Sequence, residues 1–578
     1  MSAGCCAPSP IAQAHLGAAV ASAGTTIAPA NHAAANPGSE KADLLVEGTI
    51  VTGAFGEPAA EAMAVSGGKI IGIGSRADLE GLIGPSTKLL KPDGVVIPGL
   101  IEPHMHIWTS LLNLDWTDVS HEACSTFDDV VATIKATAAK TPAGEYVLAK
   151  LFDPSLYPGE PDLTRAVLDQ IAPNNPVLVM NASMHYLYAN SAAFALVGID
   201  DTVVDPAGGT FGRTDGKLNG VIGEVPAMIL LIAKLPKPTP AEIADGITRI
   251  LNACASQGVT SLREGATGTL AGVGELAMLH QLNAARRLPV RVSTSQFAIM
   301  PGKTPTEVAA TWKEAGVTPF SGDEMVRADA WKLTSDGSNQ GRSGYFMQPY
   351  LGEDTGGHSN WTPESLHDAM KAGFDDGWQV TIHTNGDAAV EMVLGVYEDL
   401  LPNYTQKDLR HFFIHYSVTT DDQIARTAKA GLSATLLMNH VYYWGAAFRD
   451  TILGPERANH LDRTASIMRA GISTSYHSDY NVSKVQPLLS AKTGVLRKLL
   501  TDGSVLNPAE CATPQQALEA ITTNAAWQLH ADDRGSLAVG KRADFAIVDI
   551  DPWTSSPEGW DAIKVSATYI DGTVAFEA

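Results

Sequence analysis

Histidine and aspartate residues follow several short apolar segments of this sequence. His104 and His106 lie in the stretch VVIPGLIEPHMHIW, residues 95–108, which is typical of a buried β-strand. Because side chains at positions i and i+2 of a strand point to the same side, the two imidazoles are expected to converge on one point. Neutral imidazoles and carboxylates are ligands for zinc and other first-row divalent metals. The sequence therefore predicts a metal site at the end of this strand.

Residues of the same types end later apolar segments. A single buried histidine is more often a hydrogen-bonded core residue than a ligand. Several histidines at strand ends, two of them on one strand face and accompanied by an aspartate, favour metal binding instead. The later candidates at segment ends are His383, His415 and Asp479, and the fourth segment carries Lys332 within it.

Eight segments rich in β-branched residues alternate with amphipathic helical segments in the middle of the chain. This pattern is typical of an α/β fold, the (β/α)8 or TIM barrel, in which the active site lies at the C-terminal ends of the strands. The barrel is expected to occupy residues 98–534. Its strands are expected at residues 95–108, 258–265, 288–298, 329–337, 378–387, 410–417, 431–440 and 471–480.

The remaining segments predict additions to the barrel. Residues 43–97 and 535–578 contain similar short strands with glycine turns, which indicates one small β-sandwich domain built from both termini. About 150 residues separate the first two barrel strands, far more than a normal connection, so about 110–250 should form an inserted subdomain or lid. Residues 1–42 are interpreted as a flexible N-terminal arm, and residues 1–39 lack the basic region of a secretory signal.

The amino-acid composition disfavours two classes of binding partner, nucleic acids and anionic membranes. The 63 acidic and 40 basic residues give a net charge of −23, which opposes binding to nucleic acid or to anionic membranes. No run of 18 apolar residues could cross a membrane. We therefore expect a small-molecule substrate and a cytoplasmic location, with homo-oligomerisation left open. The few cysteines show no CxxC spacing and fit a reducing compartment; they are Cys5, Cys6, Cys124, Cys254 and Cys511.

The sequence resembles the amidohydrolase superfamily, within it the subgroup called amidohydrolase type 3, which includes N-substituted formamide deformylases and D-aminoacylase-like metal-dependent hydrolases. The matching stretches, from about residue 43 to 578, are PGLIEPHMH, KLTSDGSNQG, IHTNGDAAVE, IHYS, SYHSDY and ITTNAAWQLH…GSLAVGKRADFAIVD. In that family the HxH histidines bind the more buried metal, a carboxylated lysine bridges two metals, two further histidines bind the second, and an aspartate contacts metal and transfers protons. The resemblance assigns these roles to His104, His106, Lys332, His383, His415 and Asp479.

The resemblance implies hydrolysis of an amide-type carbon–nitrogen bond, with one or two divalent ions, most simply zinc and with two favoured. N-acyl amino acids, N-substituted formamides, related amides and carbamates are the implied substrates. A divalent cation lowers the pKa of bound water, giving a metal-bound hydroxide, and polarises the substrate carbonyl. Asp479 would accept the proton of the water and pass it to the leaving nitrogen.

Three alternatives remain open. One is a mononuclear deaminase of an aromatic or heterocyclic amine, although such enzymes carry a glutamate soon after the strand-five histidine. Here His383 is followed by TNGD, and the next glutamate is Glu391. The second is a single-metal site in which Lys332 is not carboxylated. The third is a barrel without catalysis, which the full set of expected ligands disfavours.

Five further residues are weaker candidates for the site. Glu264 could bridge metals in place of Lys332 or support a ligand, or it could form an ion pair with Arg263. His440 ends the seventh strand and should face the substrate, and His477 could orient Asp479. The inserted segment could bring His185 over the site. Arg342 could bind a substrate carboxylate bidentately, or it could face solvent.

Overall fold

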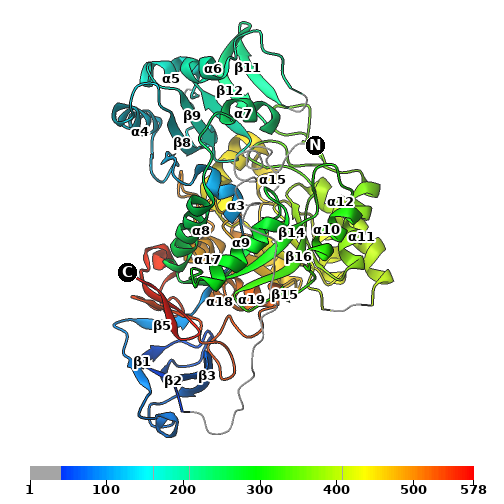
Figure 1. Ribbon diagram of the computed structural model, residues 1–578. Helices are drawn as coiled ribbons and strands as arrows, with labels where there is room; N and C mark the ends of the chain where they lie inside the picture. Colours follow the sequence, from blue (N-terminus) through cyan, green and yellow to red (C-terminus); the bar gives the residue numbers. More distant parts are fainter. Residues whose placement is uncertain (1–40, 161, 207–208, 406–407) are drawn as a thin grey trace.

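The computed structural model describes residues 41–578, except residue 161 and residues 207–208 and 406–407. Most of the predicted arm, residues 1–42, and with it Cys5 and Cys6, therefore lies outside the described residues. Figure 1 shows three parts stacked along the molecule: an inserted part above, a barrel in the middle, and a sheet made from both chain ends below. Among the described residues, no helix combines the length and apolar character needed to cross a membrane.

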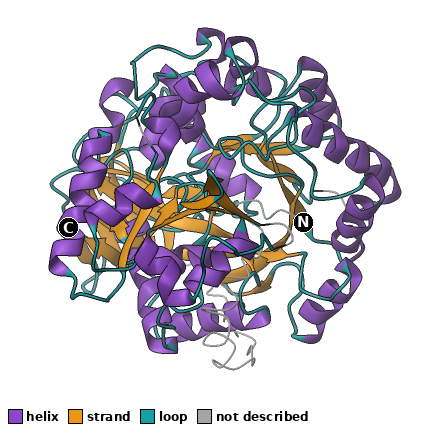
Figure 2. Ribbon diagram, turned by 90° about the horizontal axis from the view of Figure 1, so that it is seen from above, coloured by secondary structure: helices purple, strands orange, loops and turns teal. Residues whose placement is uncertain are grey.

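Eight parallel strands form the barrel, and their order in the sheet follows the chain. Seven overlap the segments that the sequence predicts. The predicted first strand, residues 95–108, is instead divided into β5 (Val95–Pro98), which joins the terminal sheet, and β6 (Leu100–Met105) of the barrel. The backbone N–H of His106 donates to Tyr480 O at 2.7 Å, which joins the ends of the first and last strands. Figure 2 shows helices surrounding these strands. The strands are β6 (Leu100–Met105), β13 (Val259–Thr267), β14 (Arg291–Phe297), β16 (Val326–Thr334), β17 (Gln379–Thr384), β18 (Phe412–His415), β19 (Ser433–Leu436) and β20 (Thr474–Tyr476), with the short β15 (Ser321–Gly322) at the edge of β16.

Thr-Pro pairs begin four of the helices that follow the chain around the barrel. The threonine side chain accepts a hydrogen bond from the third backbone N–H of the helix, and the proline occupies a position where no donor is needed. These helices are α8 (Pro240–Ala255), α10 (Pro305–Glu314), α11 (Pro363–Asp375) and α18 (Pro514–Ala520). The others include α9 (Val273–Ala284), α12 (Asp387–Leu400), α13 (Asp421–Lys429), α16 (Thr464–Arg469), α17 (Pro487–Leu496) and α19 (Thr523–Gln528).

Strands from the two ends of the chain share one sheet below the barrel. Its order is β23-β22-β21-β5-β1-β2-β3, and the antiparallel pair of β5 and β21 joins the N-terminal strands to the C-terminal ones. That residues 43–97 and 535–578 form an independent domain stays a prediction. The strands are β1 (Leu44–Ile50), β2 (Ala60–Ser66), β3 (Lys69–Gly74), β4 (Lys88–Leu90), β5 (Val95–Pro98), β21 (Phe545–Val548), β22 (Val565–Ile570) and β23 (Thr573–Glu577).

A buried ion network fixes this sheet to the barrel. Arg291 on β14 donates to both carboxylate oxygens of Asp544, at 2.7 and 3.0 Å, and lies 2.6 Å from Asp571. The side chains of Arg291 and Asp544 are each only 2% exposed. Separating them would leave buried charges without a partner, which is strongly unfavourable. The network therefore resists separation of the two parts.

The chain from β7 to α7, between β6 and β13, forms a second layer above the barrel mouth (Figure 1). A six-stranded sheet of order β11-β12-β10-β9-β8-β7 packs with helices around an apolar cluster that includes Trp116, Met180 and Phe194. That about 110–250 is an independent subdomain stays a prediction. Its elements include β7 (Thr117–Asp118), α4 (Phe127–Lys140), β8 (Val147–Phe152), α5 (Arg165–Ile171), β9 (Val177–Asn181), β10 (Tyr186–Ala189), α6 (Ser191–Val197), β11 (Thr210–Thr214), β12 (Lys217–Gly223) and α7 (Val225–Ile232).

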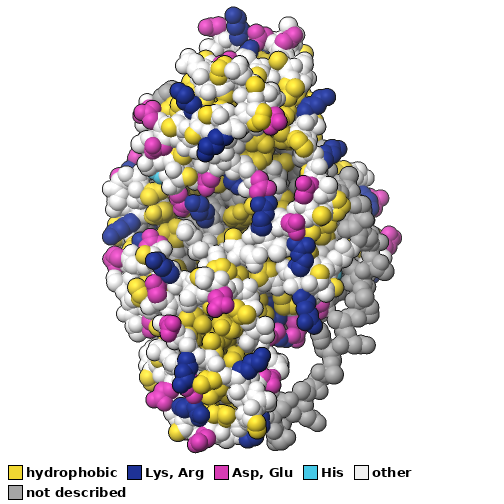
Figure 3. Space-filling model, turned by 60° about the vertical axis from the view of Figure 1, so that its left-hand side comes forward, with side chains coloured by type: hydrophobic (Ala, Val, Ile, Leu, Met, Phe, Trp, Pro, Cys, Tyr) yellow, Lys and Arg dark blue, Asp and Glu magenta, His cyan; other side chains and the backbone are white. Residues whose placement is uncertain are grey.

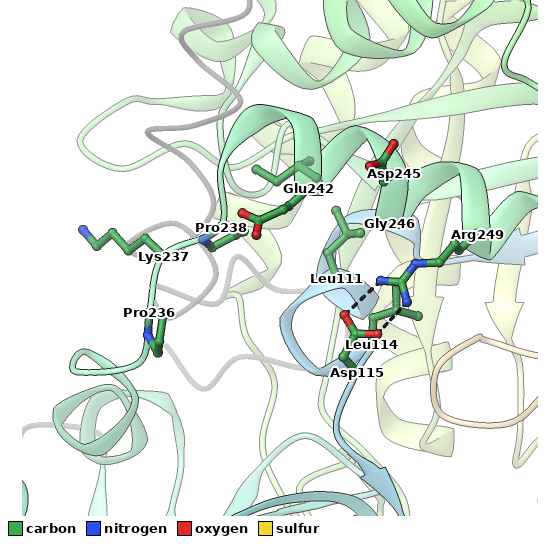
Figure 4. A pocket seen from close by; sticks show the side chains of 11 residues that line it. Leu111, Leu114, Asp115, Pro236, Lys237, Pro238, Glu242, Asp245, Gly246 and Arg249 are labelled. Carbon is green, nitrogen blue, oxygen red and sulfur yellow. Dashed lines mark hydrogen bonds and ion pairs between the residues drawn. The ribbon is translucent and has the colours of Figure 1, made fainter. Parts of the chain in front are cut away.

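An ion pair bridges the outgoing chain and the returning helix at the base of the insertion. Arg249 on α8 donates to both oxygens of Asp115, at 2.6 and 2.9 Å, and Figure 4 shows the two side chains facing each other. They border a cleft of about 530 Å³, with Leu111 and Leu114 on the same side. Because both charged side chains are largely exposed, the pair contributes little stability and mainly orients the chain.

Charged side chains of both signs are mixed on the surface. On the face drawn in Figure 3, Lys and Arg residues are interspersed with Asp and Glu residues from the insertion down to the terminal sheet.

Candidate metal centre

His104, His106 and Asp479 converge where the first and last barrel strands meet. His104 lies on β6, His106 follows it, and Asp479 follows β20. Asp479 Oδ1 is 3.2 Å from His104 Nε2 and 3.3 Å from His106 Nε2. The three candidate ligand atoms lie within 4.8 Å of one another, and all three residues are buried. The predicted convergence of two imidazoles with this carboxylate is present in the structure.

His383 and His415 continue the cluster along the neighbouring strands. His415 Nε2 is 3.1 Å from His383 Nδ1 and 4.0 Å from Asp479 Oδ2. The parallel register of β17 and β18 pairs Thr384 with His415, which sets the two histidines side by side. His415 therefore connects the pair His383–His415 to the trio around Asp479.

The backbone around the cluster is strained at two of these residues. His415 has φ 71° and Asp479 has φ 52°, values that non-glycine residues rarely adopt. Such conformations persist where the surrounding structure fixes them, commonly at functional sites.

Hydrogen bonding gives Asp479 the charge that a metal ligand needs. Burial alone opposes its ionisation, but hydrogen bonds from His104 and His106 hold the pKa of Asp479 well below its usual range. A buried anionic carboxylate among imidazole nitrogens matches the donor set that binds divalent first-row metals. The residues present thus fit a metal ion.

Lys332 lies inside the barrel, on a strand adjacent to β17. The indole N–H of Trp331 donates to Ala369 O of α11 at 3.0 Å, so Trp331 points outward to the helices and Lys332 points inward. Lys332 is fully buried. The register pairs it with Thr381 and pairs Thr334 with His383, so Lys332 lies two residues deeper than His383.

Glu264 supports His106 from strand β13. Its Oε1 is 3.9 Å from His106 Nδ1 and accepts a hydrogen bond from Ala266 N at 2.9 Å, and its Oε2 accepts one from Ile107 N. The alternative ion pair with Arg263 is not formed, because Arg263 pairs with Asp329 at 3.0 Å. Glu264 thus holds the backbone next to His106 in place.

Gly265 allows the two histidines of β6 to approach strand β13. A Cβ at this position would overlap the His104 ring and come within 3.1 Å of His106 Cε1. We expect Gly265→Ala to displace both rings, to weaken metal binding and to lower stability by about 1–3 kcal/mol. Metal titration and thermal unfolding measure the two effects.

The matched control for Gly265→Ala is Gly395→Ala, on α12, where a Cβ would meet no atom within 4 Å. Metal affinity should be unchanged in Gly395→Ala. Equal affinities in the two variants would show that Gly265 does not position the histidines.

His477 and His440 pack against the cluster. The His477 ring lies 5.1 Å from that of His104 and 5.0 Å from that of His415, and the His440 ring lies 6.1 Å from His415. Burial lowers the pKa of His440 to about 3 and that of His477 well below its usual value, so both imidazoles are neutral. His477 therefore packs between two candidate ligands.

The other two candidates have their contacts elsewhere. His185 Nδ1 lies 3.2 Å from both carboxylate oxygens of Glu224, within the insertion. Arg342 donates to Glu353 Oε1 at 2.9 Å and to the carbonyl oxygens of Leu351 and Thr451. The structure does not bring either residue to the cluster through these contacts, and their substrate roles stay predictions.

The sequence did not lead us to three residues beside the cluster, which are Glu102 and the pair Asp336 and Asn385. Glu102 accepts hydrogen bonds from the backbone N–H of His104 at 3.3 Å and of Ser478 at 3.1 Å, and burial raises the pKa of Glu102 to about 8. Glu102 thus connects the segment that carries His104 to the segment that carries Asp479. Strand alternation could have identified it, because Glu102 precedes His104 by two residues.

Asp336 and Asn385 surround His383. Asp336 accepts hydrogen bonds from the backbone N–H groups of Asn385 and Gly386, at 3.0 and 2.9 Å, and its Oδ1 lies 3.7 Å from His383 Nε2. The Asn385 side-chain nitrogen is 3.1 Å from His383 Nε2. Asp336 lies in the motif SDG and Asn385 lies in the motif TNGD. These two motifs are the sequence features that could have identified the residues.

Comparisons with known proteins agree with this arrangement. A family model described as amidohydrolase family matches residues 93–576. N-substituted formamide deformylase of Arthrobacter pascens is 27% identical over 531 residues, 90% of this chain and 95% of that protein. Protein LONG AFTER FAR-RED 3 of Arabidopsis thaliana is 27% identical over 550 residues, 93% of this chain and 92% of that protein.

A solved structure shares the fold. The uncharacterized metal-dependent hydrolase from Pyrococcus horikoshii is 20% identical, with a TM-score of 0.68 over 89% of this chain and 99% of that chain. The family model also spans all the residues of the cluster. The chain therefore belongs to the amidohydrolase family, a family of hydrolases.

Proposed function

We propose that this protein hydrolyses an amide-type carbon–nitrogen bond of a small molecule, an N-acyl or N-formyl amide or a carbamate. The observation that carries the proposal is the anionic Asp479 held between His104, His106 and His415 at the barrel mouth. A divalent ion, zinc in our proposal, when bound there polarises a carbonyl group and makes water a stronger acid. The reaction consumes water and yields an acid and an amine.

Asp479 is the proposed proton carrier. Its Oδ1 contacts the two histidines of β6, whereas its Oδ2 faces His415 at 4.0 Å. One oxygen can thus stay with the ligands while the other receives the proton of the attacking water. Delivery of that proton to the amide nitrogen makes the amine a neutral leaving group.

We further propose two metal ions, bridged by a carboxylated Lys332. A lysine ammonium would repel cations, whereas a carbamate formed with carbon dioxide is an anion with two oxygens. The inward position of Lys332, two residues deeper than His383 on the neighbouring strand, supports this role. Two residues of strand span about 7 Å, a gap that a lysine side chain can cross.

Lys332→Ala should lose activity together with part of the bound metal, because the bridging oxygens are removed. Short carboxylic acids in solution should partly restore both, and metal uptake by the metal-free parent should require bicarbonate. Metal quantification with and without bicarbonate measures this effect. Lys371→Ala, an exposed lysine of α11, is the matched control. Two metals and normal turnover in Lys332→Ala would make Glu264 the better bridge.

Deamination of an aromatic or heterocyclic amine is less well supported. The first glutamate after His383, Glu391, pairs with Arg426 at 2.7 Å and is 43% exposed, so it faces away from the cluster. The deciding experiment measures the metal content of the purified protein and assays N-acyl and N-formyl compounds, with ammonia release followed in parallel. Hydrolysis of amides without ammonia release from aromatic amines supports the proposal, and the reverse result contradicts it.

A further inference from the structure

A small apolar cavity lies where the insertion meets the barrel mouth. Its volume is about 40 Å³. Such a space suits a short alkyl group. The apolar lining comprises Leu151, Leu156 and Ala182 from the insertion and Tyr443, Trp444 and Val482 from the barrel side.

The barrel side of this cavity continues directly from the metal centre. The backbone N–H of Val482 donates to Asp479 O at 2.7 Å, so the cavity wall belongs to the same tight turn as the proton carrier. The Trp444 ring lies 6.0 Å from that of His440, which in turn lies 6.1 Å from that of His415. Two walls of the cavity, Val482 and Trp444, thus contact Asp479 and His440, which belong to the region of the metal cluster.

The insertion side is held rigidly against the barrel. The indole N–H of Trp444 donates to the buried Asp153 Oδ2 at 2.7 Å, a bond between barrel and insertion. Leu151 has φ 69°, a strained conformation for a branched residue, at the end of β8 where it lines the cavity. The hydrogen bond of Trp444 to Asp153 and the strained backbone of Leu151 both indicate that the shape of this cavity wall is important for what the cavity binds.

The charged groups at the rim neutralise each other. Lys484 Nζ lies 2.5 Å from Glu122 Oε2, and the Tyr443 hydroxyl donates to Glu122 Oε1. His121 also lines the cavity, and burial lowers the pKa of its imidazole, which is neutral at pH 7. Arg342, the candidate for binding a carboxylate, is paired with Glu353. The cavity thus offers a neutral surface.

We propose that this cavity binds a short, neutral, apolar substituent of the amide substrate, and that the enzyme prefers neutral amides to N-acyl amino acids. The inference rests on the proposed amide hydrolysis and names its substrate class. An apolar group gains from leaving water, at about 0.8 kcal/mol for each buried CH₂. A carboxylate in the same place would lose its hydration without gaining a cation.

The test measures kcat/KM for two substrate series. N-methyl-, N-ethyl- and N-propylformamide lengthen the nitrogen substituent, and N-methyl amides of formic, acetic and propionic acid lengthen the acyl group. In one series kcat/KM should rise by about fourfold for each methylene group that enters the cavity, which corresponds to about 0.8 kcal/mol. N-formylalaninamide should be hydrolysed faster than N-formylalanine, which differs by its carboxylate.

Two cavity variants make the assignment specific. Ala182→Leu fills the space and should abolish the rise with chain length while sparing the smallest substrate. Leu156→Ala enlarges the space and should move the optimum to a longer chain. Ala139→Leu, the same substitution at an exposed position of α4, should change neither series.

The outcomes separate the two proposals. If amides are hydrolysed but neither cavity variant alters the dependence on chain length, the cavity assignment is wrong. Faster hydrolysis of N-formylalanine than of its amide would overturn the preference for neutral substrates. If the metal-loaded parent hydrolyses no amide, the proposed function fails, and this inference fails with it.

Discussion

Replacing both His104 and His106 by alanine is expected to remove the metal and to abolish hydrolysis while the barrel stays folded. These residues supply two of the three donor atoms that lie within 4.8 Å of one another. Without them, only Asp479 of these three donors remains, which is too few to hold the metal there. Metal analysis of the purified variant and circular dichroism measure the two parts of this prediction.

The control for the histidine pair is His367→Ala, on the outer helix α11, where His367 lies 3.2 Å from Asp399. This variant should keep its metal and its turnover. Full metal content in the double variant His104→Ala/His106→Ala would contradict the assignment of the metal centre.

The second large effect is expected for Asp479→Asn. Asparagine keeps the size of the side chain and one oxygen atom, but it cannot accept a proton from water near neutral pH. We expect much of the metal to remain and the hydrolytic rate to fall by about 10²–10⁴-fold, the usual contribution of a general acid or base. Single-turnover rates measured at equal metal content isolate the chemical step.

Asp422→Asn, an exposed position of α13, is the matched control and should behave as the parent. The two large effects differ in kind, because the histidine pair controls metal content and Asp479 controls rate. Amide hydrolysis by Asp479→Asn at the parent rate would show that the proton travels through another residue, and His477, beside His104 and His415, is the next to test.

The barrel was predictable from sequence because its signals are local. Alternation along a strand places His104 and His106 on one side, and His383, His415 and Asp479 each end an apolar segment. The strand order also follows from the chain order, as right-handed β-α-β connections require. These features need no knowledge of distant contacts.

Contacts between distant segments were not predictable. Gly265 is required only because the register of β13 against β6 brings it under the His104 ring. Arg263 pairs with Asp329, 66 positions away, rather than with its neighbour Glu264. Likewise, Glu224 and Glu353 are the partners of His185 and Arg342, and no spacing rule indicates them. Side-chain direction in loops depends on such partners.

The insertion, about residues 110–250, is a single uninterrupted stretch of chain, and all the residues of the metal cluster lie outside it. A gene segment encoding this stretch can therefore be exchanged as a unit without changing a codon for any of those residues. Leu151, Leu156 and Ala182 would be exchanged with it. In evolution, selection for a new substrate and selection for hydrolytic power can thus act on separate parts of one gene.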